Sequence, residues 1–221
     1  MCIRDRQDLD RFFTNMDNKR LSFRKEWEVA EDVFALALIG RLVPVKDHTF
    51  FLESIAFVKN NSNEKIQVFL VGDGEEKNTL MVLCDALNLS FNTAPDPNAD
   101  IIFTSWITEV DRVLAGVDLV CLTSKNEGTP VSLIEAGCAG KPFISTDVGG
   151  VRDILLDSDQ GVVTPQGDRN AFQKSLFSWV KESKPGSVLN HALRKQIAQR
   201  FSYKQLCSKM SKVYEQLLTS Q

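Results

Sequence analysis

Short apolar runs alternate along the chain with longer segments in which apolar residues recur every three or four positions. A short apolar run is typical of a strand buried on both faces of a sheet, and the longer spacing is typical of an amphipathic helix. The runs lie at residues 33–39, 66–71, 101–104, 118–122, 141–146 and 160–163. This alternation predicts an α/β fold with a mostly parallel, doubly wound sheet, in which ligands bind beyond the carboxyl ends of the strands.

The pattern divides the chain into three parts. Residues 34–185 form the predicted domain, in which Asp47 and Asp168 are placed to cap helices. Residues 1–33 are polar with scattered aromatic side chains and are interpreted as a linker, and residues 186–221 as a helical tail. A stripe at helical spacing in the tail is expected to belong to the core: Leu206, Met210, Val213 and Leu217.

Composition excludes several classes of protein. The chain has 221 residues, 43% of them apolar, and a net charge of −3 with acidic and basic residues interspersed, so we expect no nucleic-acid binding. Five widely spaced cysteines indicate reduced thiols and a cytoplasmic location. No apolar run has the length of a membrane span. The opening Met-Cys-Ile-Arg-Asp-Arg resembles a translated sequencing adaptor, which predicts an artefactual start and a missing amino-terminal portion.

The most informative stretch follows the run at 118–122. It combines a strand end, a turn and a helix start, with Pro130 suited to the first helical turn. The free amides of such a helix favour a phosphate or a polarised hydroxyl. Glu127 and Glu135 bracket the turn and can reach different parts of one extended ligand. A surface helix with acidic residues in its first turns is the simpler alternative.

Two cations follow the first predicted strand. Gly40, Arg41 and Lys46 lie between that strand and the helix that Asp47 caps. A planar guanidinium and a mobile ammonium together suit a diphosphate. Solvated loop residues are the alternative interpretation.

These motifs resemble those of retaining glycosyltransferases of the GT-B fold, family four. The likeness rests on Glu127 and Glu135 with seven residues between them, and on Gly-Arg-Leu followed by Lys46. It covers residues 34–182 well, and implies a Rossmann-like domain, the carboxyl-terminal half of a GT-B fold.

The resemblance also implies roles for the residues. Arg41 and Lys46 would clamp the donor diphosphate, Glu127 would contact the donor sugar, and Glu135 would hold the ribose. Catalysis would rest on Glu127, Arg41 and Lys46, and donor binding would add Gly40, Gly128, Thr129, Pro130, Val131 and Glu135. The donor would be a UDP- or GDP-sugar, without a cofactor or metal. An amino-terminal domain would bind the acceptor, peripheral membrane contact would be open to the full-length protein, and this half would be inactive alone.

Several further segments and residues carry weaker functional signals. The segment 91–100 reads as a loop, and Gly72-Asp73-Gly74 as a structural turn. Ser105 stands where the family usually has glycine, and residues 105–107 are candidates to hold the base, although Trp106 is expected to be a core anchor. His48 is expected in solvent. The Asp-any-Asp sequences at 8–10 and 157–159 read as solvated loop charges.

Two alternatives to glycosyl transfer remain open on the sequence. A sugar-nucleotide epimerase has the same architecture and would isomerise a nucleotide sugar without an acceptor. A non-catalytic nucleotide-binding module would bind without transfer even when the other half is supplied.

Overall fold

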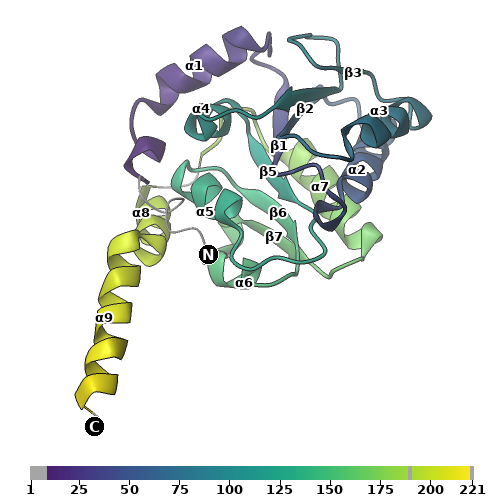
Figure 1. The fold of residues 1–221 in the computed structure, drawn as a ribbon. Helices are drawn as coiled ribbons and strands as arrows, with labels where there is room; N and C mark the ends of the chain where they lie inside the picture. Colours follow the sequence, from purple (N-terminus) through teal and green to yellow (C-terminus); the bar gives the residue numbers. More distant parts are fainter. Residues whose placement is uncertain (1–8, 189–190, 220–221) are drawn as a thin grey trace.

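The sheet is parallel throughout and confirms the predicted doubly wound architecture (Figure 1). The computed structural model describes residues 9–188 and 191–219. Within this part the sheet has seven strands in the order β3-β4-β2-β1-β5-β6-β7. Their bounds are Phe34–Ile39 for β1, Ile66–Val71 for β2, Phe91–Asn92 for β3, Ile101–Ser105 for β4, Leu119–Leu122 for β5, Phe143–Thr146 for β6 and Gly161–Thr164 for β7.

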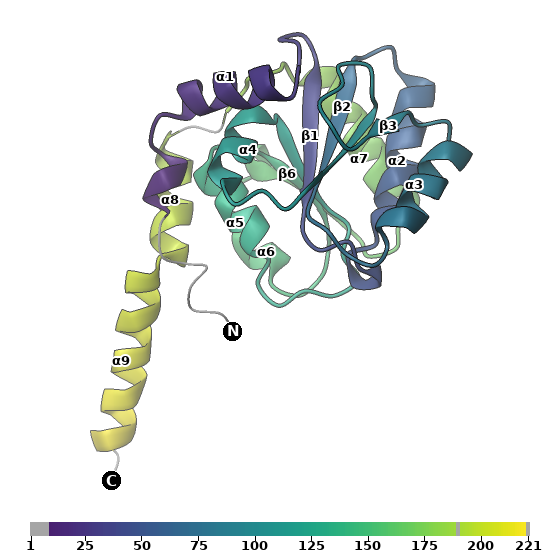
Figure 2. The same ribbon diagram turned by 45° about the horizontal axis from the view of Figure 1, so that its top comes forward.

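Helices cover both faces of the sheet (Figure 2). One face packs against α2 (His48–Asn61), α3 (Lys77–Ala86) and α7 (Arg169–Glu182). The other face packs against α1 (Met16–Glu26), α4 (Val110–Gly116), α5 (Val131–Cys138), α6 (Val151–Ile154) and α8 (His191–Phe201). The sequence of β1 shows how both faces are filled: Leu36 and Leu38 point into the first layer, and Ala35 and Ala37 into the second.

Strand β3 is a difference from the sequence-based expectation of a loop at 91–100. Its two residues pair with the edge strand β4. A strand of two residues, followed closely by prolines and an asparagine, is too short to appear as an apolar run in the sequence. The predicted caps are confirmed: the carboxylates of Asp47 and Asp168 accept hydrogen bonds from the amides of Phe50 and Ala171.

The expected linker before β1 is wrong, because this segment is folded onto the domain. Helix α1 packs against α4, and Phe12 and Phe23 are at most 1% exposed. A side chain on Gly116 would meet the Phe23 ring at 2.0 Å, so the glycine allows α1 to approach closely. Large buried aromatic rings contribute much of a core's stability. The described residues from Asp10 to the start of β1 therefore belong to the domain.

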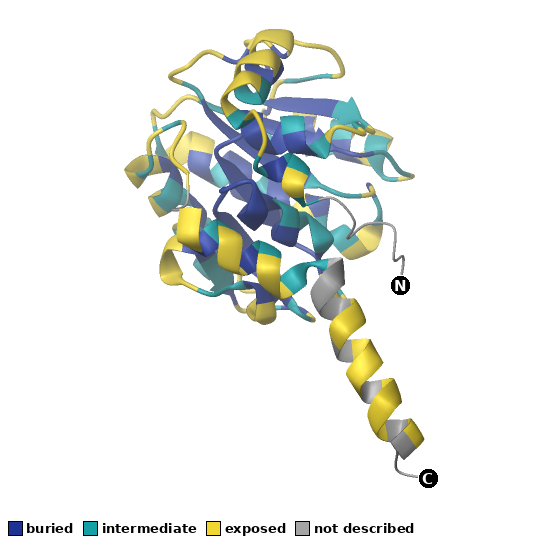
Figure 3. Ribbon diagram, turned by 90° about the vertical axis from the view of Figure 1, so that its left-hand side faces the viewer, coloured by how far each residue is buried: buried dark blue, intermediate teal, exposed yellow. Residues whose placement is uncertain are grey.

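The carboxyl-terminal segment is helical over 191–201 and 203–219, as predicted. Helix α8 lies against α5 and buries Leu193 and Ile197. Helix α9 (Tyr203–Thr219) projects away from the domain (Figures 1 and 3). The expectation of a core stripe is wrong for Met210, which is 44% exposed; the other three side chains of that stripe lie outside the described ones. None of the helices in the described part of the chain combines the length and the apolar composition that a membrane span requires.

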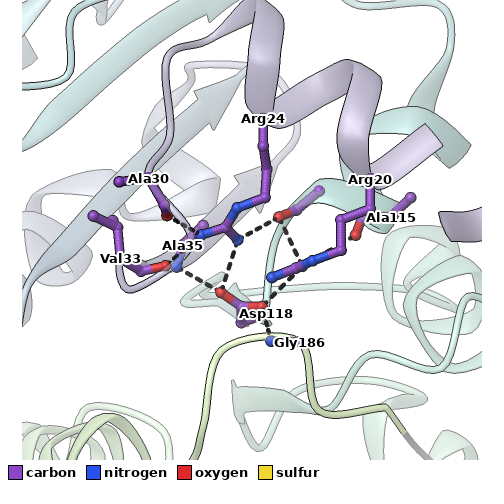
Figure 4. A network of polar contacts seen from close by, with 9 residues as sticks. Arg20, Arg24, Ala30, Val33, Ala35, Ala115, Asp118 and Gly186 are labelled. Carbon is purple, nitrogen blue, oxygen red and sulfur yellow. Dashed lines mark hydrogen bonds and ion pairs between the residues drawn. The ribbon is translucent and has the colours of Figure 1, made fainter. Parts of the chain in front are cut away.

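A buried carboxylate ties the amino-terminal edge of the sheet to α1 (Figure 4). Asp118 is 3% exposed and precedes β5. Its Oδ2 accepts from the Ala35 amide at 2.9 Å and from Arg24 at 3.3 Å. Its Oδ1 accepts from the Gly186 amide at 2.8 Å and lies 3.0 Å from Arg20. This one side chain thus links its own segment, before β5, to α1, to β1 and to the loop at Gly186.

Candidate functional site

The crevice that a doubly wound sheet forms at its switch point is expected above the carboxyl ends of β1 and β5. After β1 the chain proceeds to β2 on one side, and after β5 it proceeds to β6 on the other. Such a reversal of direction leaves a gap between the two following loops, where ligands bind in doubly wound sheets. The loop after β1 carries Gly40, Arg41 and Lys46, and the loop after β5 carries Glu127 and Gly128. The fold therefore brings the two sequence motifs to one edge.

Lys46 and Glu127 meet across this crevice. Lys46 Nζ lies 2.5 Å from Glu127 Oε1, although the residues are 81 positions apart. The side chains are 22% and 12% exposed, so solvent screens this ion pair only in part. A Cβ on Gly40 would lie 3.4 Å from Lys46 Cε, so the glycine leaves room for the lysine stem.

The turn after Glu127 is open on one side and supported on the other. A Cβ on Gly128 would meet nothing within 4 Å. On the supported side, the amide of Gly150 donates to Gly128 O at 2.8 Å. Helix α5 then begins at Val131, with Pro130 as its N-cap and no side-chain cap. Its first amides remain available to an anion or a hydroxyl.

Arg41 and Glu135 do not join the Lys46–Glu127 pair. Arg41 follows β1 with an exposed side chain. Glu135 Oε1 accepts a hydrogen bond from Arg11 at 3.5 Å. Arg11 also lies 4.0 Å from Asp111. Sequence reasoning missed Arg11. The signal in the sequence was its place beside an aromatic residue, Phe12, in a segment interpreted as a linker.

A small cavity adjoins the crevice on the side of α2. Its volume is about 430 Å³. The residues that line it come from the start of α2, the end of β6 and the loops after β1, β5 and β7: Asp47, Phe50, Thr123, Ser124, Lys125, Thr146, Gln166 and Gly167. Lys125 and Asp47 form an ion pair at 3.3 Å on its wall. Ser124 is among the residues that line this cavity.

The turn Gly72-Asp73-Gly74 supports the loop after β1, in agreement with its interpretation as structural. A Cβ on Gly72, whose φ is +146°, would lie 2.0 Å from Gly40 O. A Cβ on Gly74 would lie 2.3 Å from Leu42 O. Only glycine allows these two backbones to lie so close.

Ser105 ends β4 near the same edge, and Trp106 follows it. Ser105 adopts the left-handed conformation with φ 57°, which explains why a glycine suits this position. Its hydroxyl contacts Lys77 at 3.1 Å and Asp73 at 3.2 Å. Trp106 is 59% exposed, so the expectation of a core anchor is wrong. Tryptophan counts as apolar in a sequence pattern whether its indole ring faces the core or the solvent. The pattern therefore could not predict the exposure of Trp106, which directly follows β4.

The expectation that His48 lies in solvent is also wrong. His48 is 0% exposed, and neither ring nitrogen has a hydrogen-bond partner among the described residues. Burial lowers its pKa to about 4; the charge of Lys46 acts in the same direction and that of Asp47 opposes it. The imidazole is therefore neutral in the folded protein at pH 7, and packs as an apolar ring.

Stability is expected to fall as the pH drops from about 6.5 to about 4, because the unfolded chain binds a proton at His48 while the folded chain does not. The shift corresponds to a loss of up to about 3 kcal/mol, with stability fully present above pH 6.5. Urea unfolding between pH 7.5 and 4.5 measures it. His48→Leu should flatten the profile in this window, and the same change at the exposed His191 should not. An unchanged slope in His48→Leu would contradict the assignment.

Taken together, fold and site define a Rossmann-like domain whose two sequence motifs meet at the switch point of its sheet. Residues 19–200 match the model of the family Glycosyl transferases group 1, and the chain belongs to this family. It is 24% identical over 208 residues to the UDP-Gal:alpha-D-GlcNAc-diphosphoundecaprenol alpha-1,3-galactosyltransferase of Escherichia coli, covering 94% of this chain and 51% of that protein. It is 24% identical to the N-acetyl-alpha-D-glucosaminyl L-malate synthase of Bacillus anthracis, covering 88% and 49%.

Solved structures confirm the fold. HepE of Anabaena in complex with UDP superposes with a TM-score of 0.78 and 18% identity, over 95% of this chain and 55% of that one. Sucrose-phosphate synthase of Thermosynechococcus elongatus gives a TM-score of 0.74 and 18% identity, over 91% and 49%. The predicted Rossmann-like domain of a GT-B glycosyltransferase is thus confirmed. The chain spans about half the length of the curated relatives it matches.

Proposed function

We propose that this domain is the donor-binding half of a retaining glycosyltransferase, which transfers a sugar from a UDP- or GDP-sugar to an acceptor. The observation that carries the proposal is the Lys46–Glu127 pair at the switch point, in a chain of this family. HepE, a structural neighbour, has been crystallised with UDP and with UDP-glucose. Relatives whose names specify glycosyl transfer favour transfer over the epimerase and the non-catalytic module.

In this proposal the chemistry is electrostatic. As the bond to the sugar breaks, negative charge develops on the departing diphosphate. Arg41, Lys46 and the first amides of α5 stabilise that charge once they contact the bound diphosphate. Glu127 orients the sugar through hydrogen bonds to its hydroxyls, and Glu135 accepts from the ribose hydroxyls. Neither carboxylate serves as a covalent nucleophile, and the scheme requires no metal or cofactor.

The remaining parts of the reaction belong to the rest of the protein in this proposal. An amino-terminal domain supplies the acceptor site and the opposite wall of the cleft, so the half described here binds donor weakly and does not turn over. The complete enzyme acts in the cytoplasm, with peripheral contact to a membrane where the acceptor is a lipid.

Replacing Lys46 with alanine is expected to weaken binding of UDP or GDP by about 1–3 kcal/mol, because a charge-assisted contact is lost. The variant also leaves Glu127 uncompensated beside the phosphates. Isothermal calorimetry on the folded chain measures the affinity. The matched control is Lys59→Ala, which breaks an ion pair with Asp100 at the other end of α2. Absence of heat with both nucleotides would contradict the proposed function, and unchanged affinity in Lys46→Ala would remove this lysine from the site.

A further inference from the structure

Ser124 lies directly behind the carboxylate of Glu127. It is 0% exposed, and its hydroxyl donates to Glu127 Oε1 at 2.6 Å. This is the oxygen that Lys46 Nζ also contacts, at 2.5 Å. Within the described part of the chain, no donor contacts the second oxygen, Oε2. Both protein donors therefore converge on one side of the carboxylate.

The two donors differ in rigidity. Ser124 follows β5 directly, and its carbonyl accepts a hydrogen bond from the Thr146 hydroxyl at 2.8 Å. Thr146 ends the neighbouring strand β6, so Ser124 is tied to the sheet. Lys46 reaches Glu127 through a flexible four-carbon stem that ends in an ammonium with three donors. A ligand can redirect the ammonium, whereas it cannot move the serine without disturbing the sheet edge.

We propose that Ser124 is a positioning residue, which holds Glu127 in place for the donor sugar while Lys46 turns from Glu127 to the donor diphosphate. The inference rests on the proposed function and adds a residue to it. A diphosphate carries more negative charge than a carboxylate and attracts the ammonium more strongly. Once Lys46 has turned, the Ser124 hydroxyl is the remaining protein contact that fixes Oε1, and Oε2 accepts from a sugar hydroxyl.

This arrangement predicts different effects of a Ser124 substitution on two ligands that share one nucleotide, the free diphosphate and the nucleotide sugar. Free UDP engages Lys46 but offers nothing to Glu127, so the loss of the serine hydroxyl leaves its affinity nearly unchanged. A UDP-sugar engages Glu127 as well, and a carboxylate free to rotate binds it less well. A serine that only supports the local fold would affect both ligands alike.

The test is Ser124→Ala in this chain, with calorimetric titration of UDP, UDP-glucose, UDP-galactose, GDP and GDP-mannose. We expect binding of the sugar nucleotide to weaken about tenfold or more, as for a lost hydrogen bond to a charged group, and binding of the matching free diphosphate to change less than about twofold. Ser124→Cys, which keeps the size and a weak donor, should give an intermediate loss. The control is Thr164→Val, which removes another buried hydroxyl at the carboxyl edge, bonded to Ser145 O at 3.3 Å.

Equal weakening of the sugar nucleotide and the free diphosphate, or no weakening of either, would overturn the positioning role. Thermal unfolding verifies that each variant is folded, and Ser124→Cys decides the question if the alanine variant is not. A wild-type chain that binds none of the five nucleotides would refute the proposed function itself, and the positioning role with it. Wild-type binding together with an unselective Ser124→Ala would refute the positioning role alone.

Discussion

Replacing Asp118 with alanine is expected to lower the free energy of unfolding by about 3–5 kcal/mol, because it leaves buried cations without their counter-charge. The Arg24 side chain is only 7% exposed and that of Arg20 21%. Lys141, which is 2% exposed, lies in the same cluster. Burial, with the Arg20 charge acting in the same direction, lowers the Lys141 pKa to about 7, while the Asp118 charge opposes this shift. The alanine variant removes the carboxylate that offsets these charges, and orphans the amides of Ala35 and Gly186.

Urea unfolding at pH 7.5 measures this loss. The control is Asp32→Ala, because Asp32 also forms an ion pair with a lysine, Lys65, at 2.7 Å but has a side chain that is 62% exposed. Solvent screening makes such an exposed pair contribute little to stability. Similar losses in the two variants would show that the Asp118 network does not hold α1 on the sheet.

The sheet could be predicted from the sequence because its strands are buried on both faces. In β1, alternate residues fill two different helical layers, and all are apolar, so the run is visible without knowledge of its partners. Helix α1 gave no such signal. Phe12, Phe23 and Trp27 are irregularly spaced, and the surface that buries Phe23 includes Gly116, far along the chain. A packing partner distant in sequence cannot be found from local periodicity.

In the candidate site too, the features that follow from local sequence could be predicted, and those that depend on distant segments could not. Motif spacing placed Lys46 and Glu127 at the carboxyl ends of two strands, and strand order brought those ends together. The contact between Arg11 and Glu135 spans 124 positions and depends on how α1 and its preceding turn fold back. His48 and Trp106 were misplaced in opposite directions. Each is amphipathic, and its exposure is set by the surrounding elements rather than by its neighbours in sequence.

Gly149 is expected to tolerate no side chain, and Gly149→Ala should destabilise the domain by about 2–5 kcal/mol. One part of this cost is the left-handed backbone conformation, with φ +51°, which costs a non-glycine residue about 1–2 kcal/mol. The other part is a clash, because the new Cβ would lie 1.9 Å from the carbonyl oxygen of Glu127. That atom is backbone, so the loop must move as a unit, at a further cost of about 1–3 kcal/mol.

The matched control is Gly167→Ala. Gly167 has a similar φ of +76°, but its Cβ would meet nothing within 4 Å, so it bears only the conformational cost of about 1–2 kcal/mol. Unfolding in urea gives the stability of both variants, and calorimetry with UDP-glucose gives their affinity. Gly149→Ala should weaken binding of the sugar nucleotide because the displaced carbonyl belongs to Glu127, whereas Gly167→Ala should retain it. Equal affinities in two folded variants would mean that the turn after β5 does not position Glu127, since the clash acts on that residue's own backbone.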